Sequence, residues 1–148
     1  MTAVDIQYAC TGHGLPRRDQ IVAWVNAALR DHAHDAELTV RFVDEGEAAE
    51  LNRRWRGKSG PTNVLSFPVS GLEQAAPGLL GDIVVCAPVV EREAEQQGKR
   101  LQAHWAHMVV HGTLHLLGYD HENNEEADIM ESLEATILAG LGFPNPYD

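Results

Sequence analysis

The sequence predicts an α+β (α/β layered) fold, a single domain over residues 1–148 in which a mixed sheet of about four strands packs with about five helices. Runs with the two-residue period of a half-buried strand alternate along the chain with amphipathic helical runs, a pattern typical of layered folds. A chain of 148 residues has the length of one domain with one core, and no linker or internal repeat divides it.

Strand and helix alternate in the first half of the chain. Residues 4–10 and 37–44 have strand periodicity, and residues 45–55 have helical spacing. A helical stripe also follows Asp19, which lies where the helix dipole favours a negative charge. The apolar positions expected on the buried sides are Val4, Ile6, Tyr8 and Cys10; Ile21, Trp24, Val25, Ala28 and Leu29; Leu38, Val40 and Phe42; and Ala48, Leu51 and Trp55.

The second half contains two strands and two or three helices. A segment rich in Gly and Pro at 57–61 breaks the chain, and strand-like runs follow at 62–69 and 79–87. Pro88 suits the first turn of a helix, and the helical run after it is interrupted only at Gly98, which predicts two helices or one broken helix. The last helix should bury Ile129, Met130, Leu133, Ile137 and Leu138.

Composition limits the class of protein. No apolar stretch approaches the roughly 18 residues that span a membrane, so no membrane partner is expected. The N-terminus lacks the pattern of a secretory signal, and we expect a cytoplasmic protein. Cys10 and Cys86 are far apart and outside any CxxC pair, so both should be reduced and buried.

Four of the eight histidines fall within residues 107–121, HMVVHGTLHLLGYDH. His111 and His115 are four apart and would share one face of a helix. Gly118 suits the positive φ of a helix end, and a turn there would bring His121 back over that end. The pattern HxxxHxxGxxH has the spacing of the metzincin zinc motif, with Gly112 where those proteases carry their general base.

Three imidazoles with one open position are typical of a catalytic zinc site, although nickel, cobalt and copper also accept such ligands. The alternative is that these are ordinary surface or core histidines. For His104 and His107 a packing or supporting role is the better interpretation. The missing glutamate at 112 removes the base used in peptide hydrolysis, and Met130 lies in an expected helix rather than in a methionine turn.

A basic segment forms the second constellation. The net charge of -11 argues against a broad nucleic-acid-binding face, yet four of the eleven Lys and Arg residues fall within 53–58. Arginine forks match phosphate oxygens and would stabilise charge developing on a phosphodiester beside a metal. A solvated helix end is the alternative interpretation.

Three segments of the chain resemble the YbeY family of bacterial endoribonucleases that act on ribosomal RNA. The segments are WRGKSGPTNVLSFP, GDIVVCAPVVEREAEQQGK and AHWAHMVVHGTLHLLGYDHENNEE. The resemblance extends from about Leu51 to Met130. It implies a mixed α/β domain, one Zn²⁺ ion held by His111, His115 and His121, and Arg56 facing the metal cleft. It also implies cleavage of single-stranded RNA in 16S rRNA 3′-end maturation and ribosome quality control. The implied partners are ribosomal RNA, the small ribosomal subunit, a ribosomal protein and an rRNA-binding GTPase.

The first hypothesis is therefore a zinc-dependent endoribonuclease with Arg56 and His115 as catalytic residues. Asp120 or Glu122 would move the proton, and Asp82 would either orient a ligand histidine or serve a turn. The alternatives are a metzincin-like metallohydrolase of another substrate and a non-enzymatic ribosome assembly factor with a structural zinc. Whether water or the 2′-OH attacks stays open, and the acidic charge favours RNA recognition assisted by a partner.

Overall fold

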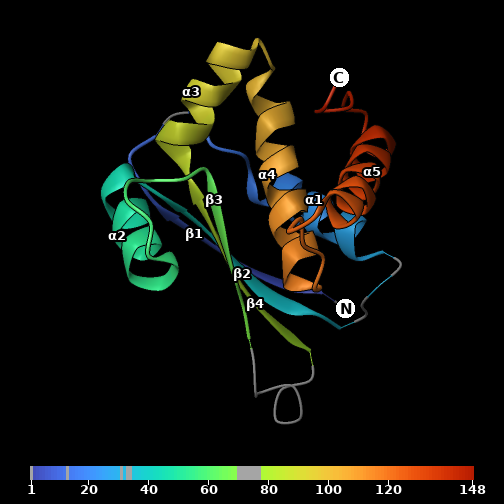
Figure 1. The fold of residues 1–148 in the computed structure, drawn as a ribbon, viewed down its shortest axis with the longest axis horizontal. Helices are drawn as coiled ribbons and strands as arrows, with labels where there is room; N and C mark the ends of the chain where they lie inside the picture. Colours follow the sequence, from blue (N-terminus) through green and yellow to red (C-terminus); the bar gives the residue numbers. More distant parts are fainter. Residues whose placement is uncertain (1, 13, 31, 33–34, 70–77) are drawn as a thin grey trace.

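The computed structural model describes the chain except for residues 1, 13, 31, 33–34 and 70–77 (Figure 1). The elements are, in order, β1 (Ala3–Ala9), α1 (Arg18–Leu29), β2 (Glu37–Val43), α2 (Glu45–Arg56), β3 (Val64–Pro68), β4 (Leu79–Cys86), α3 (Ala87–Gln97), α4 (Leu101–Leu116) and α5 (Asn124–Gly140). The predicted α+β class, with five helices and a four-stranded mixed sheet, is confirmed.

The sheet has the strand order β1-β2-β4-β3. The β1–β2 and β2–β4 pairs are parallel, whereas β3 runs antiparallel to β4 and forms one edge. Parallel neighbours need crossover connections, and α1 supplies the connection from β1 to β2. The edge position of β3 matters for function, because this strand lies between the two halves of the cleft described below.

Two hydrophobic clusters lie on opposite faces of the sheet. The larger one joins inward residues of the strands to α1, α4 and α5, and its centre includes Phe42 and Trp105, whose rings meet edge to face at 5.6 Å. The smaller one holds Val84 and Cys86 against Ala48 of α2. In Figure 1, α1, α4 and α5 gather on one side of the strands, and α2 lies apart from them. The second face is therefore only partly covered by helix.

The expected buried stripe of α1 is fully confirmed, as is that of β2. The helical run after Pro88 forms two helices, because Gly98 adopts a φ of 65° and ends α3. Among the described residues, no helix has both the length and the apolarity needed to cross a bilayer.

Three side chains contradict the predicted burial, and five more are only partly buried: Val4, Cys10, Leu51, Leu133 and Ile137. Trp55 is 62% exposed, because α2 buries only Ala48 and Asn52 and its last turn extends past the smaller cluster. Ile129 is 50% exposed, since α5 buries a narrow stripe of residues four apart. Tyr8 is 37% exposed near the end of an edge strand. Cys10 lies just beyond β1 and is half-buried, whereas Cys86 is buried as expected; both are free thiols.

Candidate active site

Three histidines meet at the C-terminal end of α4. His111 and His115 are one helical turn apart, and their Nε2 atoms are 3.1 Å from each other. Gly118 adopts a φ of 106°, and the Tyr119 amide donates to the Leu114 carbonyl, so the chain turns back over the helix end. This turn brings His121 to the other two, with one ligand atom of each histidine within 4.8 Å of the others. The predicted convergence is confirmed.

The arrangement fits a metal ion. Two nitrogens bound to one tetrahedral zinc at about 2.0–2.1 Å lie roughly 3.3 Å apart, close to the separation seen here. Burial and the neighbouring imidazoles of His111 and His121 lower the pKa of His115 to about 4. His115 is therefore neutral at pH 7 and has a free lone pair, which is the form that binds a metal.

A buried carboxylate lies behind this cluster. Glu134 of α5 is 0% exposed, and its Oε1 accepts a hydrogen bond from Nδ1 of His111 at 3.0 Å. Its Oε2 accepts from Nε2 of His107 at 2.6 Å and from the Tyr147 hydroxyl at 2.7 Å. A proton on Nδ1 of His111 leaves the Nε2 lone pair facing His115, so Glu134 selects the tautomer that the three-histidine cluster needs.

The charge of Glu134 is stabilised by its donors. Burial alone would raise the pKa of this carboxyl, but the hydrogen bonds from His107, His111 and Tyr147 outweigh it and lower the pKa to about 2. Burial and the adjacent carboxylate raise the pKa of the Tyr147 hydroxyl, which stays a donor. Glu134 is thus ionised and accepts hydrogen bonds from three side chains.

His107, His111 and Glu134 form a second group whose ligand atoms lie within 4.8 Å of one another; His107 and Glu134 are buried, His111 is partly buried, and the group could hold a metal ion. Their contacts of 2.6 and 3.0 Å are those of hydrogen bonds, and Tyr147 supplies a further donor to the same carboxylate. This geometry favours a supporting role for the group. His104 is bonded elsewhere, to Glu93 at 2.9 Å. Neither His104 nor His107 lies in the three-histidine cluster, as predicted.

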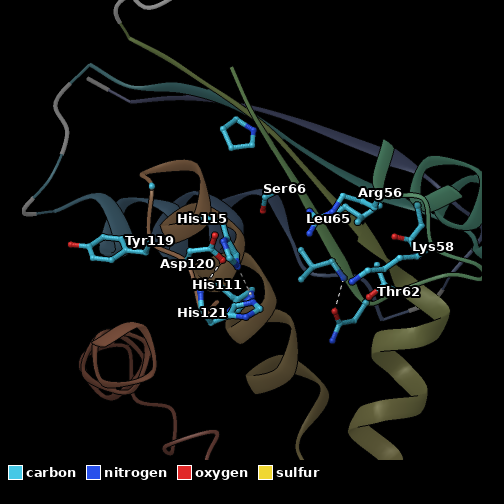
Figure 2. Close-up of a pocket in the computed structure, with 15 residues that line it drawn as sticks. Arg56, Lys58, Thr62, Leu65, Ser66, His111, His115, Tyr119, Asp120 and His121 are labelled. Carbon is cyan, nitrogen blue, oxygen red and sulfur yellow. Dashed lines mark hydrogen bonds between the residues drawn. The ribbon is translucent and has the colours of Figure 1, made fainter. Parts of the chain in front are cut away.

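A cleft of about 580 Å³ opens in front of the histidines. Figure 2 shows His111, His115, His121 and Asp120 on one side, Arg56, Lys58 and Thr62 on the other, and Leu65 and Ser66 of β3 between them. The structure therefore brings the predicted arginine and the predicted metal ligands to one cavity. Neither Arg56 nor Lys58 has a side-chain partner within the described part of the chain.

Local structure explains how the basic side reaches the cleft. Gly57 adopts a φ of 66° and ends α2 after Arg56. The buried Asn52 donates from Nδ2 to the Gly60 carbonyl at 2.8 Å and so holds the following loop against the helix. Arg56 and Lys58 are thereby fixed at their backbone while their side chains remain free to meet a ligand.

The remaining predicted residues are divided by the structure. Asp120 lines the cleft, and its Oδ1 accepts from the His121 amide at 2.8 Å, which lowers the pKa of this carboxyl. Glu122 is exposed and does not line the cleft. The suggestion that Asp82 orients a ligand histidine is wrong, because Asp82 shares its face of β4 with Val84, on the side away from α4.

Gly112 has a packing reason. A Cβ at this position would lie 2.7 Å from Cγ2 of Ile83, so α4 can approach β4 this closely only with glycine here. A glutamate at 112 would point into the sheet rather than into the cleft. The Ser66 hydroxyl, 3.2 Å from the Gly112 carbonyl, further ties the edge strand to the helix.

Sequence reasoning missed Glu134 and Tyr147. A signal for the first existed: Glu134 is spaced four residues from both Met130 and Leu138, so it is an acid on a stripe that otherwise buries apolar side chains. Tyr147 gave no such signal, because it follows the last helix and reaches Glu134 only through the path of the tail.

The fold and cleft define a class: a one-sheet α+β domain with a three-histidine cluster facing basic side chains across an open cavity. The model of the family described as "Endoribonuclease YbeY" matches residues 15–142, and the chain belongs to this family of endoribonucleases. It is also similar to the solution structure of TM1509 from Thermotoga maritima. The two share 27% sequence identity over 93% of this chain and 91% of that one, with a TM-score of 0.62.

Proposed function

We propose that the protein is a zinc-dependent endoribonuclease that cleaves single-stranded RNA during 16S rRNA 3′-end maturation and ribosome quality control. The observation that carries the proposal is the placement of His111, His115 and His121 opposite Arg56 and Lys58 in one open cleft. The first group fits a metal and the second fits a phosphodiester, and the family consists of endoribonucleases.

Each side of the cleft has a separate task. His111, His115 and His121 would hold the ion, which when bound supplies Lewis acidity toward a phosphoryl oxygen and a water of lowered pKa. Arg56 would bind the non-bridging phosphate oxygens as a fork and stabilise the charge that grows on them. Lys58 adds a second positive charge at the same wall.

Proton movement is assigned to Asp120. This carboxyl lines the cleft beside His121 and is ionised at neutral pH, so it can accept a proton from the attacking group. Glu122, the other acid considered, does not line the cavity. Asp120 is therefore the catalytic base in this proposal.

The acidic net charge gives partners a role. At a net charge of -11, the chain as a whole repels RNA, and it offers a local cationic wall at the cleft. We propose that the small ribosomal subunit, through a ribosomal protein and an rRNA-binding GTPase, presents the RNA strand to the cleft. The place of action would be the cytoplasm.

Two alternatives are less well supported. A metallohydrolase of another substrate class would need a different base from metzincins, because position 112 faces Ile83. An assembly factor with a structural metal would normally enclose the ion with four protein ligands. Here the three-histidine cluster borders an open cavity.

The test is cleavage of a single-stranded rRNA 3′-end fragment, with zinc content measured on the same samples. We expect His115→Ala to lose metal and activity together. Arg56→Glu should keep the metal and the fold but lose about a hundredfold or more in cleavage rate. Arg100→Glu, an identical charge change at the far end of α4, should cleave normally.

Zinc-loaded wild-type protein that binds the fragment without cleaving it would favour the assembly factor. A folded, zinc-loaded Arg56→Glu variant with full activity would remove the role given to this arginine.

A further inference from the structure

A second depression, of about 630 Å³, lies on the sheet face opposite α4. We propose that it binds an unpaired nucleobase of the RNA strand whose phosphodiester occupies the metal cleft. This inference rests on the proposed function and adds a base-binding site to it. The lining residues are Gln7, Thr39, Arg41, Glu47, Leu51, Trp55, Ser66, Phe67, Pro68, Asp82 and Val84.

The depression combines an aromatic surface with a polar border. Trp55 is the most exposed large apolar side chain in the described part of the chain, at 62%, and it lines this depression together with Phe67 and Leu51. Flat bases stack on such rings in single-strand-binding proteins, and open sheet faces carry them in several RNA-binding folds.

The depression borders the metal cleft across the edge strand β3. Ser66 and Pro68 of the edge strand β3 line both cavities. A strand that leaves the histidine cluster across β3 therefore reaches the Trp55 side of the sheet directly. Trp55 also directly precedes Arg56, which lines the cleft itself.

The charges along this path suit a nucleic-acid backbone. Arg54, Arg56 and Lys58 lie at or just after the end of α2, and within the described residues their side chains have no hydrogen-bonding or ionic partner. In a chain with a net charge of -11, three uncommitted cations in this one place are a local feature. Phosphates would lie along these cations, and the base would enter the depression between them and the sheet.

The sheet supplies groups that can read a base edge. Thr39 and Asp82 are neighbours across the β2–β4 pair, and neither side chain is bonded to another described residue. Arg41, which also lines the depression, is already engaged, because its guanidinium donates to the Glu47 carboxylate at 2.7 Å and to the Gln7 side-chain oxygen at 2.8 Å. The Asp82 carboxylate accepts hydrogen bonds only, so it suits the exocyclic amino group of adenine, cytosine or guanine; the one ring donor of uracil, N3–H, lies between two carbonyl oxygens that repel a carboxylate.

The tryptophans allow a direct measurement. Trp24 and Trp105 are 4% and 0% exposed, so Trp55 is the one tryptophan that a ligand can reach. We would titrate chelator-treated full-length protein, checked for fold by circular dichroism, with short single-stranded RNA. Tryptophan emission and fluorescence anisotropy would be recorded together, for the wild type, Trp55→Ala, Trp55→Phe, Asp82→Asn and an Ile129→Ala control.

The expected result is that RNA quenches Trp55 emission and that Trp55→Ala weakens RNA binding about tenfold or more, the scale of one stacked base. Trp55→Phe should retain most of the affinity, and Ile129→Ala, which removes a different exposed apolar side chain, should change nothing. Asp82→Asn should reduce the preference for amino-bearing bases over uracil.

RNA binding that depends on Arg56 but leaves Trp55 emission and the Trp55→Ala affinity unchanged would overturn the base site while the proposed function stands. Zinc-loaded wild-type protein that neither binds nor cleaves RNA would overturn both.

Discussion

The Nδ1 atom of His111 lies 3.0 Å from Oε1 of Glu134, a carboxylate with 0% exposure. This contact joins a helix that carries the proposed metal ligands to a helix that carries none. It holds the proton of His111 on Nδ1 and therefore leaves the lone pair on Nε2, the nitrogen that lies toward His115. The quality of the metal site thus depends on how α5 docks against α4.

Replacing Glu134 should weaken metal binding without removing a ligand. Glu134→Gln replaces an acceptor by an amide that can also donate, so the His111 tautomer is no longer fixed, and we expect zinc affinity to fall about 10- to 100-fold. The measurement is competition with a chelating zinc indicator, supported by the visible spectrum of the Co²⁺-loaded protein. Asp128→Asn, an exposed acid on the same helix, is the matched control. Unchanged zinc affinity in Glu134→Gln would show that His111 needs no support.

Tyr147 should contribute to the metal site through the hydrogen-bond network of Glu134 and His107. Tyr147→Phe removes the hydroxyl that donates to Oε2 at 2.7 Å and should cost about 1 kcal/mol of unfolding free energy together with a smaller loss of zinc affinity. Combined with Glu134→Gln in a double-mutant cycle, the two effects on zinc affinity should not add, because both act on one hydrogen-bond network. Additive losses would place Tyr147 outside this network.

Gly112 should tolerate no side chain. In Gly112→Ala the new Cβ meets Ile83 at 2.7 Å, and the required shift between helix and sheet should lower the free energy of unfolding by about 1–3 kcal/mol. Chemical denaturation measures this loss. On an Ile83→Ala background the same substitution should cost much less, since the clashing atoms are gone. An equal cost on both backgrounds would mean that another contact is responsible.

Acid should destabilise the protein partly through His104. Burial lowers the pKa of this imidazole, against the opposing effect of Glu93. The unfolded chain then takes up a proton at about pH 6.5, while the folded chain stays neutral to lower pH. The contribution of His104 to the free energy of unfolding is therefore complete above pH 6.5, and it is lost as the pH falls toward the pKa of His104 in the folded protein. With a chelator present, the unfolding free energy of His104→Gln should decrease less than that of the wild type between about pH 7.5 and 5.5. Parallel decreases would contradict this assignment.

The elements were predictable because periodicity is a local property of the chain. The three histidines were predictable for the same reason, since spacing along one helix and one positive-φ glycine bring them together. Glu134 was not, because its partners come from another helix and from the tail. One of the two roles considered for Asp82, orienting a ligand histidine, was wrong, since which side of β4 points toward α4 depends on the docking of that helix. Trp55 was expected to be buried because its spacing fits the α2 stripe, but the smaller cluster ends before the last turn of α2.

All three imidazoles of the cluster lie within residues 111–121, whereas Arg56, Glu134 and Tyr147 come from distant parts of the chain. A short segment closes a ring around an ion with little loss of chain entropy, so the unfolded protein should already have measurable zinc affinity. Binding to the unfolded chain subtracts from the stabilisation that a ligand gives to the native state. Zinc should therefore raise the melting temperature by less than its native-state affinity implies.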